Sequence, residues 1–242
     1  MRIIRDYQFI ADVDRGAVAA IGNFDGVHLG HQAALNLVRK IAAESGSYVG
    51  ALTFEPHPRE YFAPESPAFR LMSAEAKANR LDKLGVERLY QLNFNATLSA
   101  LGAREFARDV IKKALGLTHV VIGADFCFGN GRTGTAQDLM DYGQEFGFEV
   151  TIAELVKDGE QIFSSTAIRN ALSEGRPEDA ARMLGHWHRI EGPVIQGHQR
   201  GRELGYPTAN ISIDGLHPPK YGVYAVTAVS YTHLTLPTIY SV

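Results

Sequence analysis

Two histidines three positions apart are the residues in this sequence best placed to do chemistry. His28 and His31 stand in the stretch Gly22-Asn-Phe-Asp-Gly-Val-His-Leu-Gly-His31, which follows a short apolar run and opens an amphipathic pattern. At the start of a helix, residues three apart share one face, and the free backbone N–H groups there favour an anion. The stretch therefore predicts a phosphate site faced by two imidazoles.

A His-x-Gly-His turn suits attack on the α-phosphate of a nucleotide. The attack builds negative charge on the phosphoryl oxygens and on the leaving pyrophosphate, and imidazole N–H donors fixed in advance stabilise that charge. Gly30 leaves the backbone bare, so we expect the nucleotide to lie against it. Ordinary loop histidines are the competing interpretation. A zinc site is another, but it needs further ligands, and only His57 offers itself nearby.

A second candidate phosphate site is the stretch Ser164-Ser-Thr-Ala-Ile-Arg169. Hydroxyls and N–H groups at a helix start, with an arginine one turn in, can hold phosphate oxygens. An ordinary capped helix with a solvated arginine fits the same pattern equally well. The loop over 123–134 is also open to two interpretations, a ligand loop or a tight turn that packs two phenylalanines inward. No Walker A sequence occurs, so a P-loop ATPase is not indicated.

Strands and helices alternate over the first three quarters of the chain. Strands are expected over 17–21, 48–54, 88–92, 119–122 and 148–155, and the prolines at 56 and 58 break the second of them. Helices are expected between the strands: one ended by Gly46, one capped by Ser73, one over about 103–115 and one capped by Thr135. Two more follow, the first capped by Ser164 or Ser165 and the second with Pro177 in its first turn. This order is typical of βαβ units and predicts an α/β fold with a mostly parallel sheet. Ligands of such sheets bind beyond the carboxyl ends of the strands. The turn at 22–31, the turn Glu55-Pro-His-Pro58 and the loop at 123–134 are therefore expected to face one cleft.

The pattern changes between residues 183 and 188. From Arg189 onward, short apolar pieces are divided by glycine and proline without a helical period, which predicts small-barrel or hairpin structure. After Lys220 the chain has no charged side chain, which is unusual for a natural strand edge. We therefore expect an α/β domain over 1–183, a partial β-domain over 184–229 and a separate tail over 230–242.

Composition excludes several kinds of partner. The 242 residues are 45% apolar and 21% charged, which is ordinary for a globular protein. The formal charge of −3 gives no electrostatic reason to expect nucleic acid or an anionic membrane. The single Cys127 suits a reducing compartment. Neither a signal peptide nor an apolar run near the ~20 residues of a membrane span is present. We expect a cytoplasmic protein that acts on small molecules.

Five motifs in fixed order resemble those of the bacterial bifunctional riboflavin kinase/FAD synthetase family. The motif His-x-Gly-His alone is shared with many nucleotidylyltransferases and class I aminoacyl-tRNA synthetases, whereas the ordered set is specific. The resemblance extends from the N-terminus to about Val229. The motifs are Gly22–His31, Thr53-Phe-Glu-Pro-His-Pro58, Gly123-Ala-Asp-Phe-Cys-Phe-Gly129, Ser164-Ser-Thr-x-x-Arg169 and Gly201-Arg-x-Leu-Gly-Tyr-Pro-Thr-Ala-Asn210.

The resemblance implies a Rossmann-like domain that transfers AMP from ATP to FMN, giving FAD and pyrophosphate, followed by an incomplete riboflavin-kinase β-barrel. It implies that His28 and His31 stabilise the transition state at the ATP phosphates. Mg²⁺ would neutralise the triphosphate and help pyrophosphate leave. The other implied residues are Gly22, Phe24, Gly30, Asp125, Phe128, Ser164, Ser165, Thr166 and Arg169 for ATP; His57, Pro58 and Phe62 for the flavin; and Thr208 and Asn210 for Mg²⁺ in the kinase half.

The sequence departs from the family after Val229. The family continues through further barrel strands, including a glutamate that serves as general base on the ribityl hydroxyl, whereas 230–242 does not match its pattern. We therefore expect a truncated barrel without riboflavin kinase activity. Two other functions stay open: another small-molecule nucleotidylyltransferase, which the Pro-His-Pro turn and the Pro-Thr-Ala-Asn segment disfavour, and a flavin- or nucleotide-binding protein without turnover.

Overall fold

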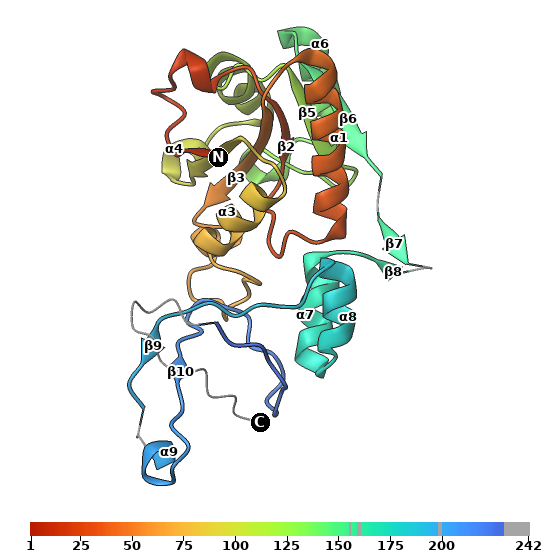
Figure 1. Ribbon diagram of the computed structural model, residues 1–242. Coiled ribbons are helices and arrows are strands. Elements are labelled where there is room, and N and C mark those ends of the chain that lie inside the picture. Colours follow the sequence, from red (N-terminus) through yellow and green to blue (C-terminus); the bar gives the residue numbers. More distant parts are fainter. Residues whose placement is uncertain (155, 159–160, 198–199, 230–242) are drawn as a thin grey trace.

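A six-stranded parallel sheet forms the centre of the computed structural model, which describes residues 1–154, 156–158, 161–197 and 200–229 (Figure 1). The strand order is β1-β4-β3-β2-β5-β6, and every neighbouring pair is parallel. The predicted α/β fold with a parallel sheet is confirmed. The strands are β1 (Arg2–Ile4), β2 (Val18–Ile21), β3 (Val49–Glu55), β4 (Arg88–Asn93), β5 (His119–Gly123) and β6 (Glu149–Ala153).

The order of strands reverses at β2. From β2 the chain moves outward to β3 and β4, and then returns to the other side of β2 for β5 and β6. The connections that leave β2 and β5 therefore diverge to opposite sides of the sheet. A crevice outside the carboxyl ends of such strands is the usual ligand site of an open parallel sheet. The turn that carries the two histidines follows β2 directly.

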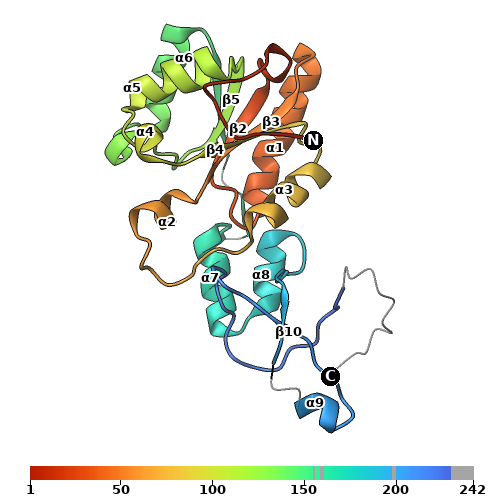
Figure 2. The same cartoon turned by 90° about the vertical axis from the view of Figure 1, so that its left-hand side faces the viewer.

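Helices cover both faces of the sheet (Figures 1 and 2). The apolar residues of α1 and α3 pack with one face, and those of α6 and the π-helical segment η2 pack with the other. Two of the predicted helix ends are confirmed, since Ser73 caps α3 and Gly46 ends α1 in the left-handed conformation. These elements are α1 (Leu29–Ser45), α3 (Ala74–Lys83), α5 (Ala103–Glu105), η2 (Phe106–Ala114) and α6 (Ala136–Phe146).

Several short elements were not predicted. They are β1, the 3-10 turns η1 (Asp12–Asp14) and η3 (Asn130–Arg132), and the helices α2 (Pro58–Phe62) and α4 (Ala96–Ser99). Each has five residues or fewer, which is too short for a periodic pattern to be read. The expected helix at 103–115 exists, but most of it is π-helical. The strand expected to reach 155 ends at Ala153.

A helical pair lies at the carboxyl end of the sheet (Figures 1 and 2). The helices α7 (Ser165–Glu174) and α8 (Pro177–Leu184) share a small apolar core that also contains Leu71. The predicted cap at Ser164 is confirmed, because its hydroxyl accepts the Ala167 N–H at 3.1 Å. Pro177 takes the first helical position of α8, as expected. The antiparallel pair β7 (Lys157–Asp158) and β8 (Gln161–Ile162) precedes α7.

We call residues 1–184 the first lobe and the residues after α8 the second lobe. Strands β9 (Val194–Ile195) and β10 (Asn210–Ile211) pair antiparallel, and the short helix α9 (Arg200–Glu203) lies between them in the chain. Hairpin structure was predicted here, but α9 was not. The chain then returns to the first lobe, where the N–H of His217 donates to the Arg70 carbonyl at 2.8 Å and that of Lys220 to the Leu172 carbonyl at 2.9 Å.

The division at residue 183 stays a prediction, and the expected tail over 230–242 lies outside the described residues. Within the described ranges, none of the helices combines the length and apolar character needed to cross a bilayer.

Candidate active site

The two histidines lie together at the start of α1. His28 is the N-cap residue, and its Nδ1 accepts the backbone N–H of His31 at 3.4 Å. The two rings stack with their centroids 3.7 Å apart and an interplanar angle of 26°. Because Nδ1 of His28 is an acceptor, the neutral ring carries its proton on Nε2, which is left to donate to a ligand. The predicted shared face is confirmed.

Both imidazoles are neutral at pH 7. Burial lowers the pKa of His28 to about 4, and Arg169 adds to the effect while Asp125 partly offsets it. Burial, followed by the neighbouring His28, lowers the pKa of His31 well below its usual value. The Nδ1 of His31 is buried without a hydrogen-bond partner in the described part of the chain. A buried polar atom without a partner is a reason to expect a ligand at this place.

Gly30 has a structural role beside the one expected. A methyl group at this position would lie 3.0 Å from both Nδ1 and Cε1 of His28. The space beside Gly30 is therefore taken by the imidazole of His28. The absence of a side chain lets that ring lie over the first turn of the helix, so Gly30 positions His28; its contact with a nucleotide stays a prediction.

Replacing Gly30 with alanine is expected to lower adenylyl transfer, the activity that the resemblance implies, about tenfold, because His28 must shift by a few tenths of an ångström from its position. The melting temperature should change little, since alanine is a good helix former. Steady-state kinetics and thermal unfolding check both expectations. Gly222→Ala is the matched control, because a methyl group there meets only atoms of Tyr224 at 3.6 Å or more. Full activity of Gly30→Ala would contradict this role.

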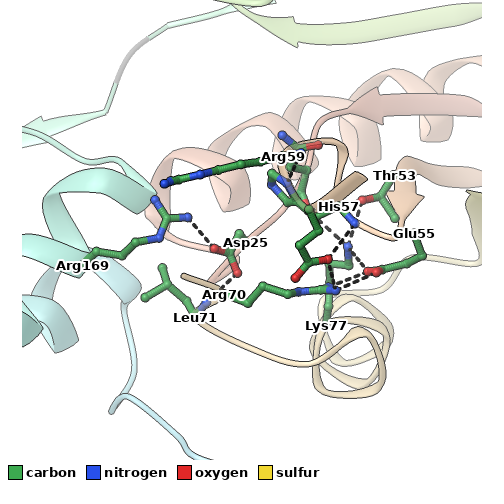
Figure 3. Close-up of polar contacts among 11 residues, drawn as sticks. Asp25, Thr53, Glu55, His57, Arg59, Arg70, Leu71, Lys77 and Arg169 are labelled. Atoms are coloured by element: carbon green, nitrogen blue, oxygen red, sulfur yellow. Dashed lines mark hydrogen bonds and ion pairs between the residues drawn. The ribbon is translucent and has the colours of Figure 1, made fainter. Parts of the chain in front are cut away.

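Asp25 connects the histidine turn to α7 and to the segment around Leu71 (Figure 3). Its Oδ1 accepts the Leu71 N–H at 2.8 Å, and its Oδ2 pairs with the Arg169 guanidinium at 2.6 Å. Its backbone carbonyl accepts the Ser165 hydroxyl at 2.7 Å, and Arg169 also donates from Nε to the Phe69 carbonyl at 2.6 Å. Asp25 is 4% exposed, so its charge needs a partner inside the protein. Sequence reasoning missed this structural role of Arg169 and Ser165; their contacts with ATP stay predictions.

A second buried network joins the carboxyl ends of β2 and β3. The Lys77 ammonium is 2.7 Å from Glu55 Oε1 and donates to Thr53 Oγ1 at 3.1 Å and the Asn23 carbonyl at 3.3 Å. Burial lowers the pKa of Lys77. Lys77 was not predicted. The sequence does hold a signal for it: Lys77 lies four residues before Leu81 and therefore shares the buried face of α3.

Arg70 completes this network on the other side of Glu55. Its guanidinium donates to both oxygens of that carboxylate, at 2.7 and 2.8 Å. Burial acts to raise the pKa of Glu55, but the hydrogen bonds from Arg70 and Lys77 outweigh it and lower the pKa. The charges of the three side chains therefore hold the β3 turn and the β2 turn in one fixed arrangement (Figure 3).

The turn after β3 carries the residues expected on the flavin side. The prolines at 56 and 58 were expected to break the strand here, and β3 ends at Glu55. Pro58 then opens α2, because proline suits the first helical position. His57 caps this helix: its Nδ1 accepts the Arg59 N–H at 3.1 Å, while Glu60 accepts the His57 N–H at 3.1 Å. Burial lowers the pKa of His57 to about 4. Phe62 is 66% exposed, with its ring centroid 5.7 Å from that of Phe94.

Two aromatic residues expected on the ATP side have side chains that belong to the core. Phe128 is 7% exposed, and its ring packs on Phe126 at 5.4 Å and on Phe106 at 5.9 Å. The loop at 123–134 therefore packs phenylalanine inward, which is the second of the two interpretations above. Phe24 is 1% exposed and supports the ring of His31 at 5.1 Å. Both aromatic side chains therefore support the site from the core, and their contact with the nucleotide stays a prediction.

The remaining predicted residues have varied positions. Asp125 is exposed, forms no ion pair within the described residues, and is close enough to His28 to influence its pKa. Gly22 is next to Phe24, whose ring would lie 3.8 Å from a methyl group there. Thr166 is exposed in the first turn of α7.

The two residues expected in the kinase half lie in the second lobe. Both are exposed, and Asn210 opens β10. Two glycines approach them: a methyl group at Gly197 would overlap the Asn210 amide, and one at Gly201 would lie 3.3 Å from the Thr208 hydroxyl. Over the described ranges, no group of three or more His, Cys, Asp and Glu side chains is arranged to hold a metal ion.

The fold and the site together define a class. A parallel sheet whose strand order reverses at β2, with a His-x-Gly-His turn opening the helix after that strand, has the architecture of a nucleotidylyltransferase domain.

Comparisons with known proteins narrow this class to a family. A family model described as FAD synthetase matches residues 10–167, and one described as riboflavin kinase matches residues 184–242, a range that includes the segment expected to be a separate tail. The chain belongs to the bacterial bifunctional riboflavin kinase/FAD synthetase family.

Individual relatives agree with this assignment. A protein of Pseudomonas fluorescens named bifunctional riboflavin kinase/FMN adenylyltransferase is 41% identical to this chain, and the match covers 94% of this chain and 73% of the relative. A protein of Escherichia coli with the same name is 35% identical, and the match covers 99% of this chain and 77% of the relative. A solved structure described as a macrolide-efflux protein from Streptococcus pneumoniae superposes with a TM-score of 0.80 at 33% identity, covering 92% of this chain and 72% of that one. The chain thus spans about three quarters of these relatives.

Proposed function

We propose that this protein transfers the AMP moiety of ATP to the phosphate of FMN, giving FAD and pyrophosphate. The observation that carries the proposal is the neutral, stacked pair His28 and His31 at the first turn of α1, beyond the carboxyl end of β2. Membership of a family whose named members are FMN adenylyltransferases supports the choice of acceptor.

The reaction needs no covalent intermediate on the protein. An oxygen of the FMN phosphate attacks the α-phosphorus of ATP, and the bond from that phosphorus to the pyrophosphate oxygen breaks. The charge that builds on the phosphoryl oxygens and on the leaving group is met by the Nε2–H of His28, the ring of His31 and the free N–H groups of the first turn of α1. These donors are fixed before the substrate arrives, because Gly30 and Phe24 hold the two rings in place.

Two further parts of the site fit the substrates. The exposed ring of Phe62, beside the turn of His57 and Pro58, offers an aromatic face to the flavin. Mg²⁺ binds in proteins through one or two carboxylates together with substrate phosphates. Asp125, an exposed carboxylate near His28 with no ion-pair partner among the described residues, fits that requirement. When bound, Mg²⁺ would neutralise part of the triphosphate charge. The proposal covers adenylyl transfer alone, and a cytoplasmic location stays a prediction that rests on the sequence.

Incubation with ATP, Mg²⁺ and FMN, followed by separation of the flavins, tests the proposal. FAD should form in amounts equal to the pyrophosphate released. Nicotinamide mononucleotide and phosphopantetheine, offered in place of FMN, test the alternative acceptors and should yield no adenylylated product. Binding of FMN and ATP without pyrophosphate release would support a binding protein without turnover and would contradict the proposed function.

A further inference from the structure

Two arginines from different elements converge on one buried aromatic ring. The guanidinium carbon of Arg59, from α2, lies 4.5 Å from the ring centroid of Phe69, and that of Arg169, from α7, lies 5.2 Å from the same centroid. Phe69 is 6% exposed, so the ring is a fixed platform. Such cation–π contacts are attractive, but two like charges on one ring repel each other.

The charges around this ring are balanced except for one. Asp25 pairs with Arg169, and the carboxylates Glu55 and Glu60 face Arg70 and Lys77. These three carboxylates therefore face three cations. The nearby His57 is neutral, because burial lowers its pKa to about 4.

Arg59 is the surplus charge. Arg59 is exposed and forms no ion pair with a carboxylate in the part of the chain that the structure describes, and its guanidinium lies over the Phe69 ring. An exposed guanidinium that is already oriented by a ring, and that has no counter-charge, is suited to bind an anionic ligand.

Arg59 lies between the flavin side and the nucleotide side of the proposed site. Arg59 follows His57 and Pro58, the turn on the flavin side, and the Phe69 ring packs edge-on against His57 at 4.9 Å. On the other side, Leu71, two residues after Phe69, donates its N–H to Asp25 in the histidine turn, and Arg169, which pairs with Asp25, donates to the Phe69 carbonyl. A phosphate bound at Arg59 would therefore lie between the flavin and the α-phosphate of ATP.

We propose that Arg59 binds the phosphate group of FMN and so distinguishes FMN from riboflavin. This inference rests on the proposed function. The phosphate of FMN is the nucleophile, so it has to be held at the point where the flavin side meets the nucleotide turn. The planar fork of a guanidinium binds two phosphate oxygens at once, whereas the network around Asp25 and Glu55 leaves no other cation uncompensated.

Flavin binding, followed by the quenching of flavin fluorescence, tests this role without requiring turnover. The wild-type protein and Arg59→Gln are each titrated with FMN and with riboflavin, which differ only in the phosphate. Removal of one hydrogen-bonded charge pair lowers the affinity for a ligand about tenfold or more. Arg59→Gln should lose that much for FMN and less than twofold for riboflavin, and Arg59→Lys should lie between the two proteins. Arg104→Gln is the matched control, since Arg104 also lies over an aromatic ring, Phe146, at 5.2 Å.

Three results would overturn the inference. Equal loss of affinity for FMN and riboflavin would show that Arg59 contacts the flavin ring or supports the fold, and does not bind the phosphate. A loss confined to ATP, measured by calorimetry, would assign it to the nucleotide. Unchanged affinity of Arg59→Gln for FMN would show that Arg59 does not bind FMN. Each of these is distinct from failure of the proposed function, in which the wild-type protein itself would form no FAD.

Discussion

Replacement of His28 with alanine should lower kcat for FAD formation by about 10²- to 10³-fold, the loss typical when one fixed donor to a developing oxyanion is removed. The affinity for FMN should change little, because the imidazole acts on charge that builds only in the transition state. The same substitution also removes the N-cap of α1, which costs about 1 kcal/mol of stability.

A second variant separates the two effects. Asparagine is among the best N-cap residues, so His28→Asn should recover the stability lost in the alanine variant. It should not recover turnover, because the amide cannot reproduce the donor at Nε2. Thermal unfolding and steady-state kinetics of both variants check this. If His28→Asn regained both stability and kcat, the role of His28 would be to cap the helix, and the mechanism given above would be wrong.

Replacement of Asp25 with alanine is expected to give the largest loss of stability, about 3–5 kcal/mol in the free energy of unfolding. The change leaves the Arg169 guanidinium, 14% exposed, without its counter-charge and the Leu71 N–H without its acceptor. Urea denaturation of the wild type and the variant measures the difference. The control is Asp109→Ala, whose half-exposed pair with Arg108 should contribute about 0–1 kcal/mol.

A double variant makes this prediction specific. If the cost of Asp25→Ala comes from an uncompensated buried charge, removing that charge in Asp25→Ala/Arg169→Met should restore part of the stability. Strictly additive losses in the two single variants and the double variant would show that the pair is not coupled. In that case Asp25 would act only through its backbone and through Leu71.

The sequence was sufficient for the parts of the fold whose signals are local. The parallel sheet followed from alternating apolar runs, and the caps at Ser73, Thr135 and Ser164 followed from single residues at helix starts. The pairing of His28 and His31 also follows from helical geometry alone.

What the sequence could not give depends on contacts between distant elements. Asp25 and Arg169 are 144 positions apart, and nothing in either neighbourhood indicates that a buried ion pair will join them. The platform at Phe69 brings together α2 and α7 in the same way. The burial of Phe128 likewise depends on a distant element, because its ring packs on Phe106 of η2.

The origin of the phosphorus atoms in the product tests the central claim most directly. With FMN, Mg²⁺ and ATP labelled at the α-phosphate, the account predicts that the label appears in FAD, whereas label at the γ-phosphate appears only in pyrophosphate. His28→Ala should abolish most of the transfer of the α-label while the protein still binds FMN. Release of ADP, or a flavin product that carries the γ-label, would contradict adenylyl transfer at the turn of His28 and His31.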